Sequence, residues 1–227
     1  MASDFIKFPH TPHLTGLPSK PSRADRVLSN AEVKTFLRGE VIIEEKVDGA
    51  NLGISVSPEN HLVVQNRGAF IERTTSEQFK PLWGWLNIRA DELTLLLGQN
   101  LILFGEWCFA VHSVRYSRLP DWFIGFDIYD RHAGRYYSSD RRDRTLSSLQ
   151  LFTVPRIGKG HYSVSQLMRI LEEEHSSFGT EKLEGLYLRR DSEDWLEQRA
   201  KIVRDEFTQS IDAHWSSRPL SRNVIAR

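Results

Sequence analysis

Residue types capable of chemistry are concentrated in one short stretch of the chain, residues 44–51, which read E-E-K-V-D-G-A-N. Two carboxylates, Glu45 and Asp48, flank the amine of Lys46, and the amide of Asn51 follows. Such a set of side chains is typical of a site that binds or transforms a charged ligand. The alternative is a plain surface hairpin, because Asp-Gly is a common turn signal.

Two short apolar segments are predicted to position this stretch. Residues 41–43 are all β-branched and lead into it as a strand, and residues 52–56 alternate apolar and small residues, which is the pattern of a second strand. Lys46 is therefore expected at a strand end or in a tight connection, where Gly49 can adopt backbone angles that other residues avoid.

Five later stretches place further polar or aromatic residues on or beside predicted strands. Each has an ordinary explanation when taken alone, such as a loop or a core strand. Together they would require five coincidences in sequence order, so we favour one shared site. They are residues 66–68 with Arg67, residues 104–107 with Glu106, residues 123–129 with Phe126, residues 184–188 with Glu184, and residues 199–204 with Arg199, Lys201 and Arg204.

The pattern Lys-x-Asp-Gly-x-Asn at residues 46–51 resembles motif I of the covalent nucleotidyltransferases, which include RNA ligases, DNA ligases and mRNA capping enzymes. With the later stretches, the series resembles motifs I, Ia, III, IIIa, IV and V of that superfamily across residues 41–207. It is most similar to the ATP-dependent RNA ligase group. The segments 7–14 and 214–219 also resemble those of small stand-alone bacterial RNA-ligase-like proteins.

The resemblance implies two catalytic lysines. Lys46 would be the nucleophile that attacks the α-phosphorus of ATP. Because a lysine is mostly protonated at neutral pH, a nearby cation must lower its pKa. Lys201 and a bound metal ion are expected to supply that charge, and Lys201 would also neutralise the α-phosphate during transfer.

The same resemblance implies a set of nucleotide-binding residues. Asn51 and Arg67 would hold the ribose or phosphate region, Glu106 would accept a hydrogen bond from a ribose hydroxyl, and Phe126 would stack on adenine. Mg²⁺ or Mn²⁺ would be held through water by Glu184 and Glu106, since Mg²⁺ keeps several waters. The full set expected to bind the cofactor ATP is Glu45, Asp48, Asn51, Arg67, Glu106, Phe126, Glu184 and Arg199.

The last motif departs from the usual Lys-x-Lys. The best register is Arg199-Ala-Lys201, with Arg204 as a third cation. If the motif instead began at Lys201, Val203 would replace its second cation. The individual roles of Arg199 and Arg204 therefore stay open at this point.

Many predicted strands and a few helices without strict alternation indicate an α+β fold. The resemblance implies a nucleotidyltransferase (ATP-grasp-like ligase) core of two antiparallel-rich sheets with flanking helices and the nucleotide between the sheets. We expect residues 1–227 to form a single domain, with residues 1–30 as an extended N-terminal arm and 208–227 as a short tail. The 20 residues after Phe207 are too few for an OB-fold.

The overall charge of the chain is balanced, with 30 Lys and Arg against 30 Asp and Glu. A surface that binds nucleic-acid phosphates must then be local. The segment 131–144, with five arginines, is a candidate, and a solvated charged helix face is the alternative.

The sequence also gives expectations about location. Cys108 is the single cysteine, so an intramolecular disulfide is excluded and a reducing compartment is plausible. The N-terminus lacks the apolar core of a signal peptide, and no apolar run is long enough for a membrane span. A cytoplasmic protein that does not bind membranes is expected.

These expectations combine into an ATP-dependent RNA ligase that joins RNA 5′-phosphate and 3′-hydroxyl ends through a lysyl-AMP intermediate and an adenylylated RNA end. The alternatives are a related capping-type or protein-modifying transferase, and a non-catalytic module that binds RNA ends. The sequence leaves the structure of the RNA substrate and the oligomeric state open.

Overall fold

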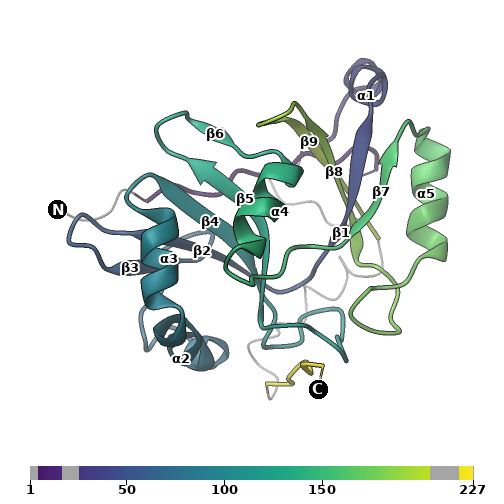
Figure 1. Cartoon of the computed structure of the whole chain (residues 1–227). Coiled ribbons are helices and arrows are strands. Elements are labelled where there is room, and N and C mark those ends of the chain that lie inside the picture. Colours follow the sequence, from purple (N-terminus) through teal and green to yellow (C-terminus); the bar gives the residue numbers. More distant parts are fainter. Residues whose placement is uncertain (1–4, 17–25, 205–219, 227) are drawn as a thin grey trace.

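The computed structural model describes residues 5–16, 26–204 and 220–226 (Figure 1). Its helices are α1 (Asn30–Leu37), α2 (Lys80–Ile88), α3 (Ala90–Leu97), α4 (Ser139–Ser147) and α5 (Val164–Glu173), with a 3-10 helix, η1 (Glu77–Phe79), before α2. Its strands are β1 (Val41–Lys46), β2 (Ala50–Val56), β3 (Leu62–Gln65), β4 (Leu101–Trp107), β5 (Phe123–Asp130), β6 (Arg135–Tyr136), β7 (Arg156–Gly160), β8 (Gly185–Asp191) and β9 (Leu196–Val203). The expected α+β class is confirmed.

The strands form two antiparallel sheets. The first sheet has the order β7-β1-β8-β9, and the second has the order β3-β2-β4-β5-β6. Lys46 at the end of β1 is the pairing partner of Gly185 at the start of β8, and Asn51 near the start of β2 is the partner of Glu106 on β4. The short β1–β2 connection thus carries the chain from the first sheet to the second.

The outer face of the second sheet is covered by helices (Figure 1). The alternation in β2 points Leu52 and Ile54 into a core that they share with Leu82 of α2 and Leu93 of α3. Pro81 lies in the first turn of α2, where its missing N–H is tolerated.

The outer face of the first sheet packs on α5 and α1. Val41 and Ile43 of β1 share a buried core with Leu167 and Leu171 of α5. Ser163 caps α5, because its hydroxyl accepts from the backbone N–H of the third helical residue in a capping box. In the part of the chain that the structure describes, no helix is long and apolar enough to cross a membrane.

A buried network of charges joins the two sheets. Arg142 of α4 pairs with Glu44 of β1 at 2.7 Å, and Arg189 of β8 pairs with Asp127 of β5 at 2.6 Å. The carbonyl of Phe126 accepts from both guanidinium groups, at 2.6 and 3.4 Å. Removing one partner of a buried ion pair typically costs about 3–5 kcal/mol, so this network fixes how the sheets face each other.

Within the N-terminal arm, residues 12–14 run along β9, and the residues before them pass between the sheets. The backbone N–H of Lys201 donates to the carbonyl of Pro12, and the Lys201 carbonyl accepts from Leu14. Farther toward the N-terminus, the buried ring of Phe8 packs on Phe104 and Phe126 of the second sheet. The predicted tail segment 214–219 lies outside the described residues.

Candidate active site

Lys46 ends β1 beside Glu184, which directly precedes β8. The Lys46 ammonium donates to both carboxylate oxygens of Glu184, each at 2.6 Å. The Lys46 side chain is 27% exposed and that of Glu184 is 9% exposed, so the lysine is partly exposed while its partner is covered. The two residues meet because β1 and β8 are paired, although 138 positions separate them in the sequence.

Two glycines near Lys46 in the sequence or the fold lie where another backbone segment approaches closely. A Cβ on Gly185 would lie 2.4 Å from the carbonyl oxygen of Ile202 and 3.3 Å from Cδ of Lys46. A Cβ on Gly49 would lie 2.8 Å from the carbonyl oxygen of Trp107. Both positions therefore exclude a side chain because of close backbone approach.

Asp48 holds a loop beside the lysine. Its carboxylate accepts from the backbone N–H groups of Ser113 and Val114, at 2.5 and 2.9 Å. Its own N–H donates to the hydroxyl oxygen of Tyr116 at 2.7 Å. Asp48 therefore organises the loop after β4, which no sequence pattern had indicated.

Asn51 and Glu106 lie opposite each other on β2 and β4 and present unused polar atoms. Both polar atoms of the Asn51 amide, and Oε2 of Glu106, are buried and have no hydrogen-bond partner among the described residues. Buried polar groups without partners are costly and usually indicate a missing ligand or water. An amide and a carboxylate side by side fit the hydroxyl groups of a ribose, so the site fits a nucleotide.

Two of the carboxyls around Lys46, those of Glu106 and Glu184, have raised pKa values. Burial raises the pKa of Glu106 to about 8 and that of Glu184 to about 7, against the attraction of Lys46, and Asp48 raises both further. For Lys46, burial lowers the pKa, but Glu184, Asp48 and Glu106 outweigh it, so the pKa lies above its ordinary value. That Lys201 and a bound metal ion together lower the pKa of Lys46 stays a prediction.

Arg67 and Lys201 complete the charged surroundings. Arg67 is exposed and lies in the turn after β3, where Asn66 accepts from two backbone N–H groups. Its charge lowers the pKa of Glu106, and that of Lys201 lowers the pKa of Glu184. Both cations are thus close enough to act on the same carboxyl groups as Lys46.

Glu45 lies elsewhere. Successive residues of a strand point to opposite faces, so Glu45 and Lys46 diverge. The Glu45 carboxylate is buried and accepts from the hydroxyl of Ser176 at 2.5 Å and from the backbone N–H of Ser177 at 3.0 Å. The structure does not bring Glu45 to the cluster around Lys46.

Phe126 lies at an irregularity of β5, where the register to β4 shifts by one residue. Its half-buried ring meets Phe8 edge-on, with 5.0 Å between the ring centroids. Phe126 thus faces the space between the sheets, and the arm contributes one wall of its surroundings.

Arg199 belongs to the inter-sheet network. Its guanidinium donates to Asp127 at 3.1 Å and to the hydroxyl oxygen of Tyr187 at 3.2 Å, and it stacks on the ring of Tyr136. Arg204 donates to the carbonyl of Leu171 on the α5 side. Of the three cations in the last motif, the structure therefore places Lys201 nearest the carboxyls of the site.

Two further residues near the site were missed by sequence reasoning. His112 is partly buried beside Gln78, and burial lowers its pKa with a further contribution from Lys46. Asn223, near the C-terminus, donates to the carbonyls of Cys108 and Ala110 and accepts from a backbone N–H, so it fastens the loop that Asp48 holds. Neither lies in a recognisable motif.

The raised pKa of Glu106 gives a stability prediction. The carboxyl is neutral in the folded protein below about pH 8 but charged in the unfolded chain above pH 4.5, so it destabilises the fold increasingly as pH rises between these values. In protein without nucleotide or metal, Glu106→Gln should raise Tm at about pH 9 by roughly 3 °C or more, with little change near pH 4.5. Glu92→Gln, at an exposed carboxylate of α3, is the control. An equal gain in Tm for Glu106→Gln at every pH would contradict the raised pKa of Glu106.

The comparisons with known proteins agree with this geometry. The two sheets, with Lys46 ending β1 opposite Glu184, have a fold similar to that of solved RNA ligase structures. Residues 39–203 match the RNA ligase family, and the chain therefore belongs to that family. Among curated proteins, no match is found.

Solved structures of Naegleria gruberi RNA ligase are similar in fold. The structure with PPi superposes with a TM-score of 0.60 and 21% identity, over 76% of this chain and 52% of that chain. A lysine-to-alanine variant with ATP and Mn gives 0.60 and 18%, over 92% and 64%. A lysine-to-methionine variant with AMP and Mn gives 0.60 and 17%, over 89% and 63%. The chain spans about half the length of the Naegleria protein with PPi.

Proposed function

We propose that this protein is an ATP-dependent RNA ligase. Nζ of Lys46 attacks the α-phosphorus of ATP, and the bond to pyrophosphate breaks. A 5′-phosphate of RNA then takes AMP from Lys46, and an RNA 3′-hydroxyl displaces AMP and forms the phosphodiester bond. The observation that carries this proposal is the placement of Lys46 beside Glu184 and near Glu106, whose partner Asn51 has unused polar atoms.

Lys46 must lose a proton before it attacks. Glu184 holds the ammonium in place, and the surrounding carboxyls favour the charged form. Mg²⁺ or Mn²⁺, held through water by Glu184 and Glu106, would counter these carboxylates and favour the neutral amine. Some of the similar Naegleria gruberi structures contain ATP or AMP with Mn, which supports a nucleotide and a divalent metal as cofactors here.

We assign the nucleotide contacts to a subset of the expected residues. Asn51 and Glu106 meet the ribose, Arg67 meets a phosphate, Phe126 meets the base, and Lys201 meets the α-phosphate. Three others support the site without touching the nucleotide, because their side chains have protein partners: Glu45, Asp48 and Arg199.

Phe126 provides a test of base stacking. Stacking on an aromatic side chain is worth roughly 1–3 kcal/mol per base. Phe126→Ala should therefore weaken ATP use by about ten- to a hundredfold, seen as a higher KM for ATP in the adenylation step. Phe126→Tyr and Phe126→Trp should largely retain it. An equal loss in Phe126→Trp would instead indicate tight packing against Phe8.

The proposal is tested by following one phosphorus atom. The protein is incubated with α-labelled ATP and a divalent metal, and then with nicked RNA that carries a 5′-phosphate. A ligase moves the label from protein to RNA and releases it as AMP when the nick closes. A protein-modifying or capping-type transferase would label an acceptor other than the 5′-phosphate, and an RNA-end-binding module would take up no label. We further propose that the protein acts in the cytoplasm, in keeping with its single cysteine, Cys108, which is buried and free.

A further inference from the structure

The loop after β4 connects the motif around Lys46 to the C-terminal segment, residues 220–226. Asp48 accepts from Ser113 and Val114 on one side of this loop. On the other side, the N–H of Val111 donates to the carbonyl of Ser221. Figure 1 shows the C-terminal segment beside this loop. The loop is therefore held from two directions and presents a fixed surface.

A second loop, residues 176–179, joins the same surface. Glu45 accepts from Ser176 and Ser177, so this loop is also anchored at the end of β1. The carbonyl of Phe178 accepts from the backbone N–H groups of residues 117 and 118. Both loops are therefore fastened to the strand that carries Lys46, and they contact each other.

Three arginines of these segments are exposed: Arg115, Arg118 and Arg222. Arg115 donates to the hydroxyl of Ser221 at 2.7 Å, and Arg118 donates to the carbonyl of Ser177 at 3.2 Å. The Arg222 side chain lies over the ring of Phe109. Among the described residues, no carboxylate pairs with any of the three, so none of the described carboxylates offsets their positive charge. We call these three residues the arginine face.

The segment 131–144, which the sequence offers as one candidate for phosphate binding, differs from this arginine face. Arg142 is buried against Glu44, Arg135 pairs with Glu197, and Arg141 stacks on Tyr137 and a tryptophan. Two of its five arginines are therefore paired with carboxylates, and a third is held against aromatic rings. In a chain of zero net charge, a cluster of arginines that pairs with none of the described carboxylates is the more effective binder of phosphates.

We propose that the arginine face binds the phosphate backbone of the RNA strand whose 5′-phosphate receives AMP from Lys46. Guanidinium groups suit phosphate oxygens, and three of them on fixed loops would guide a strand toward the end of β1. This inference rests on the proposed ligase function. It names the surface that would hold RNA, which the nucleotide site alone does not provide.

The test measures RNA binding separately from adenylation. A fluorescent, 5′-phosphorylated single-stranded RNA is titrated with the wild type and with the triple variant Arg115→Gln, Arg118→Gln, Arg222→Gln, at several salt concentrations. Each lost phosphate contact lowers the slope of log K against log salt by about 0.7, so the slope should fall by about two. At about 0.1 M salt, affinity should fall roughly a hundredfold. Adenylation without RNA should be unchanged.

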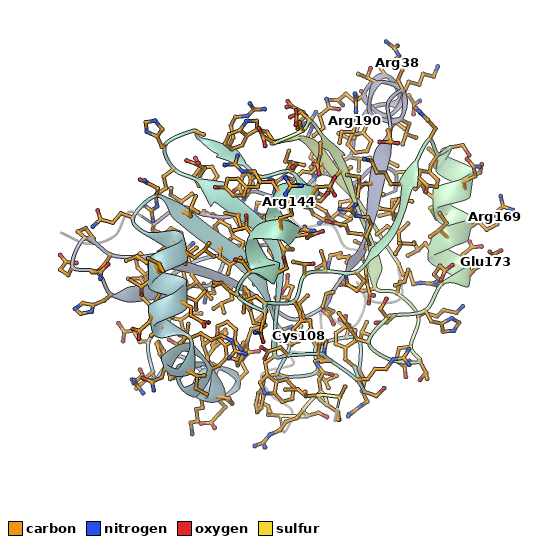
Figure 2. The ribbon with its side chains drawn as sticks, viewed as in Figure 1. Arg38, Cys108, Arg144, Arg169, Glu173 and Arg190 are labelled. Atoms are coloured by element: carbon orange, nitrogen blue, oxygen red, sulfur yellow. The ribbon has the colours of Figure 1, made fainter. Side chains whose placement is uncertain are left out.

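The control is a second triple variant, Arg38→Gln, Arg73→Gln, Arg169→Gln, at exposed arginines away from these loops. Figure 2 labels Arg38 near α1 and Arg169 on α5. It should bind RNA like the wild type. A variant with lysine at all three positions of the arginine face should regain most of the affinity, because counterion release depends on charge.

Unchanged RNA binding in the glutamine variant, or an equal loss in the control, would overturn the proposal. Loss of adenylation in both the glutamine and the lysine variants would also overturn it, because the arginines would then support the nucleotide site. Failure of the wild type to form an adenylate, with salt-dependent RNA binding through the arginine face intact, would refute the ligase function and leave an RNA-binding surface.

Discussion

Lys46→Ala should abolish both the protein adenylate and the sealing of 5′-phosphorylated RNA. The variant should still seal RNA that already carries AMP on its 5′-phosphate, because the last step needs no lysine nucleophile. The expected loss is complete within detection, since the remaining amines lack the position opposite Glu184. Gel assays measure sealing separately on 5′-phosphorylated RNA and on RNA that already carries AMP.

Lys46→Arg is the matched control for charge. A guanidinium can keep the pairing with Glu184 but stays protonated, so it cannot attack phosphorus. It should fold like the wild type and be as inactive as Lys46→Ala on 5′-phosphorylated RNA. Sealing of that substrate by either variant would contradict the role of Lys46.

Lys201→Ala should slow adenylation by at least about a hundredfold. Lys201 lies on β9, and its charge reaches Glu184, so it is placed to stabilise the α-phosphate as pyrophosphate leaves. Removing one preorganised donor from a developing charge typically costs that much in rate. Single-turnover labelling with saturating ATP isolates this step.

Two variants distinguish a role of Lys201 in adenylation from a purely structural role. Lys201→Arg should recover little activity, because a planar guanidinium does not replace a compact ammonium. Lys159→Ala, at an exposed lysine of β7, should be unaffected. Near wild-type adenylation in Lys201→Ala would instead mean that another cation acts at the phosphate, and Arg199 would have to leave Asp127 to do so.

Much of the fold follows from local sequence patterns. Residues 41–43 and 52–56 form strands as expected, because their apolar side chains fit a sheet face. Ser163 begins α5 through its capping box. These elements carry their own signals of spacing and capping, so no knowledge of tertiary contacts was needed.

Other elements depend on partners that the sequence does not reveal. β7, residues 156–160, has two glycines and a single aliphatic residue, and it forms because β1 offers an open edge. The apolar pattern of residues 151–154 also predicts a strand, and that prediction is wrong, since only Thr153 forms an isolated bridge there, to Gly125. Pairing across the sheet decided both outcomes.

The candidate site, like the fold, was predictable only where local sequence patterns mark its residues. Lys46, Glu106 and Glu184 come together in the structure because three strand ends converge, and the motif series anticipated them. The partners of Arg199 could not be predicted, because Asp127 reaches it from the other sheet. Asn223 carries no local signal at all, and only the folded chain shows what it fastens.

The central claim is that Lys46 carries AMP between ATP and RNA, and the mass of the intact protein tests it most directly. After incubation with ATP and Mg²⁺ or Mn²⁺, the wild-type protein should gain the mass of one adenylyl group, located by peptide mapping on Lys46. Addition of 5′-phosphorylated nicked RNA should return the protein to its original mass as the nick is sealed. An adenylyl group on another residue, or sealing by a protein that never gains the mass, would contradict the account.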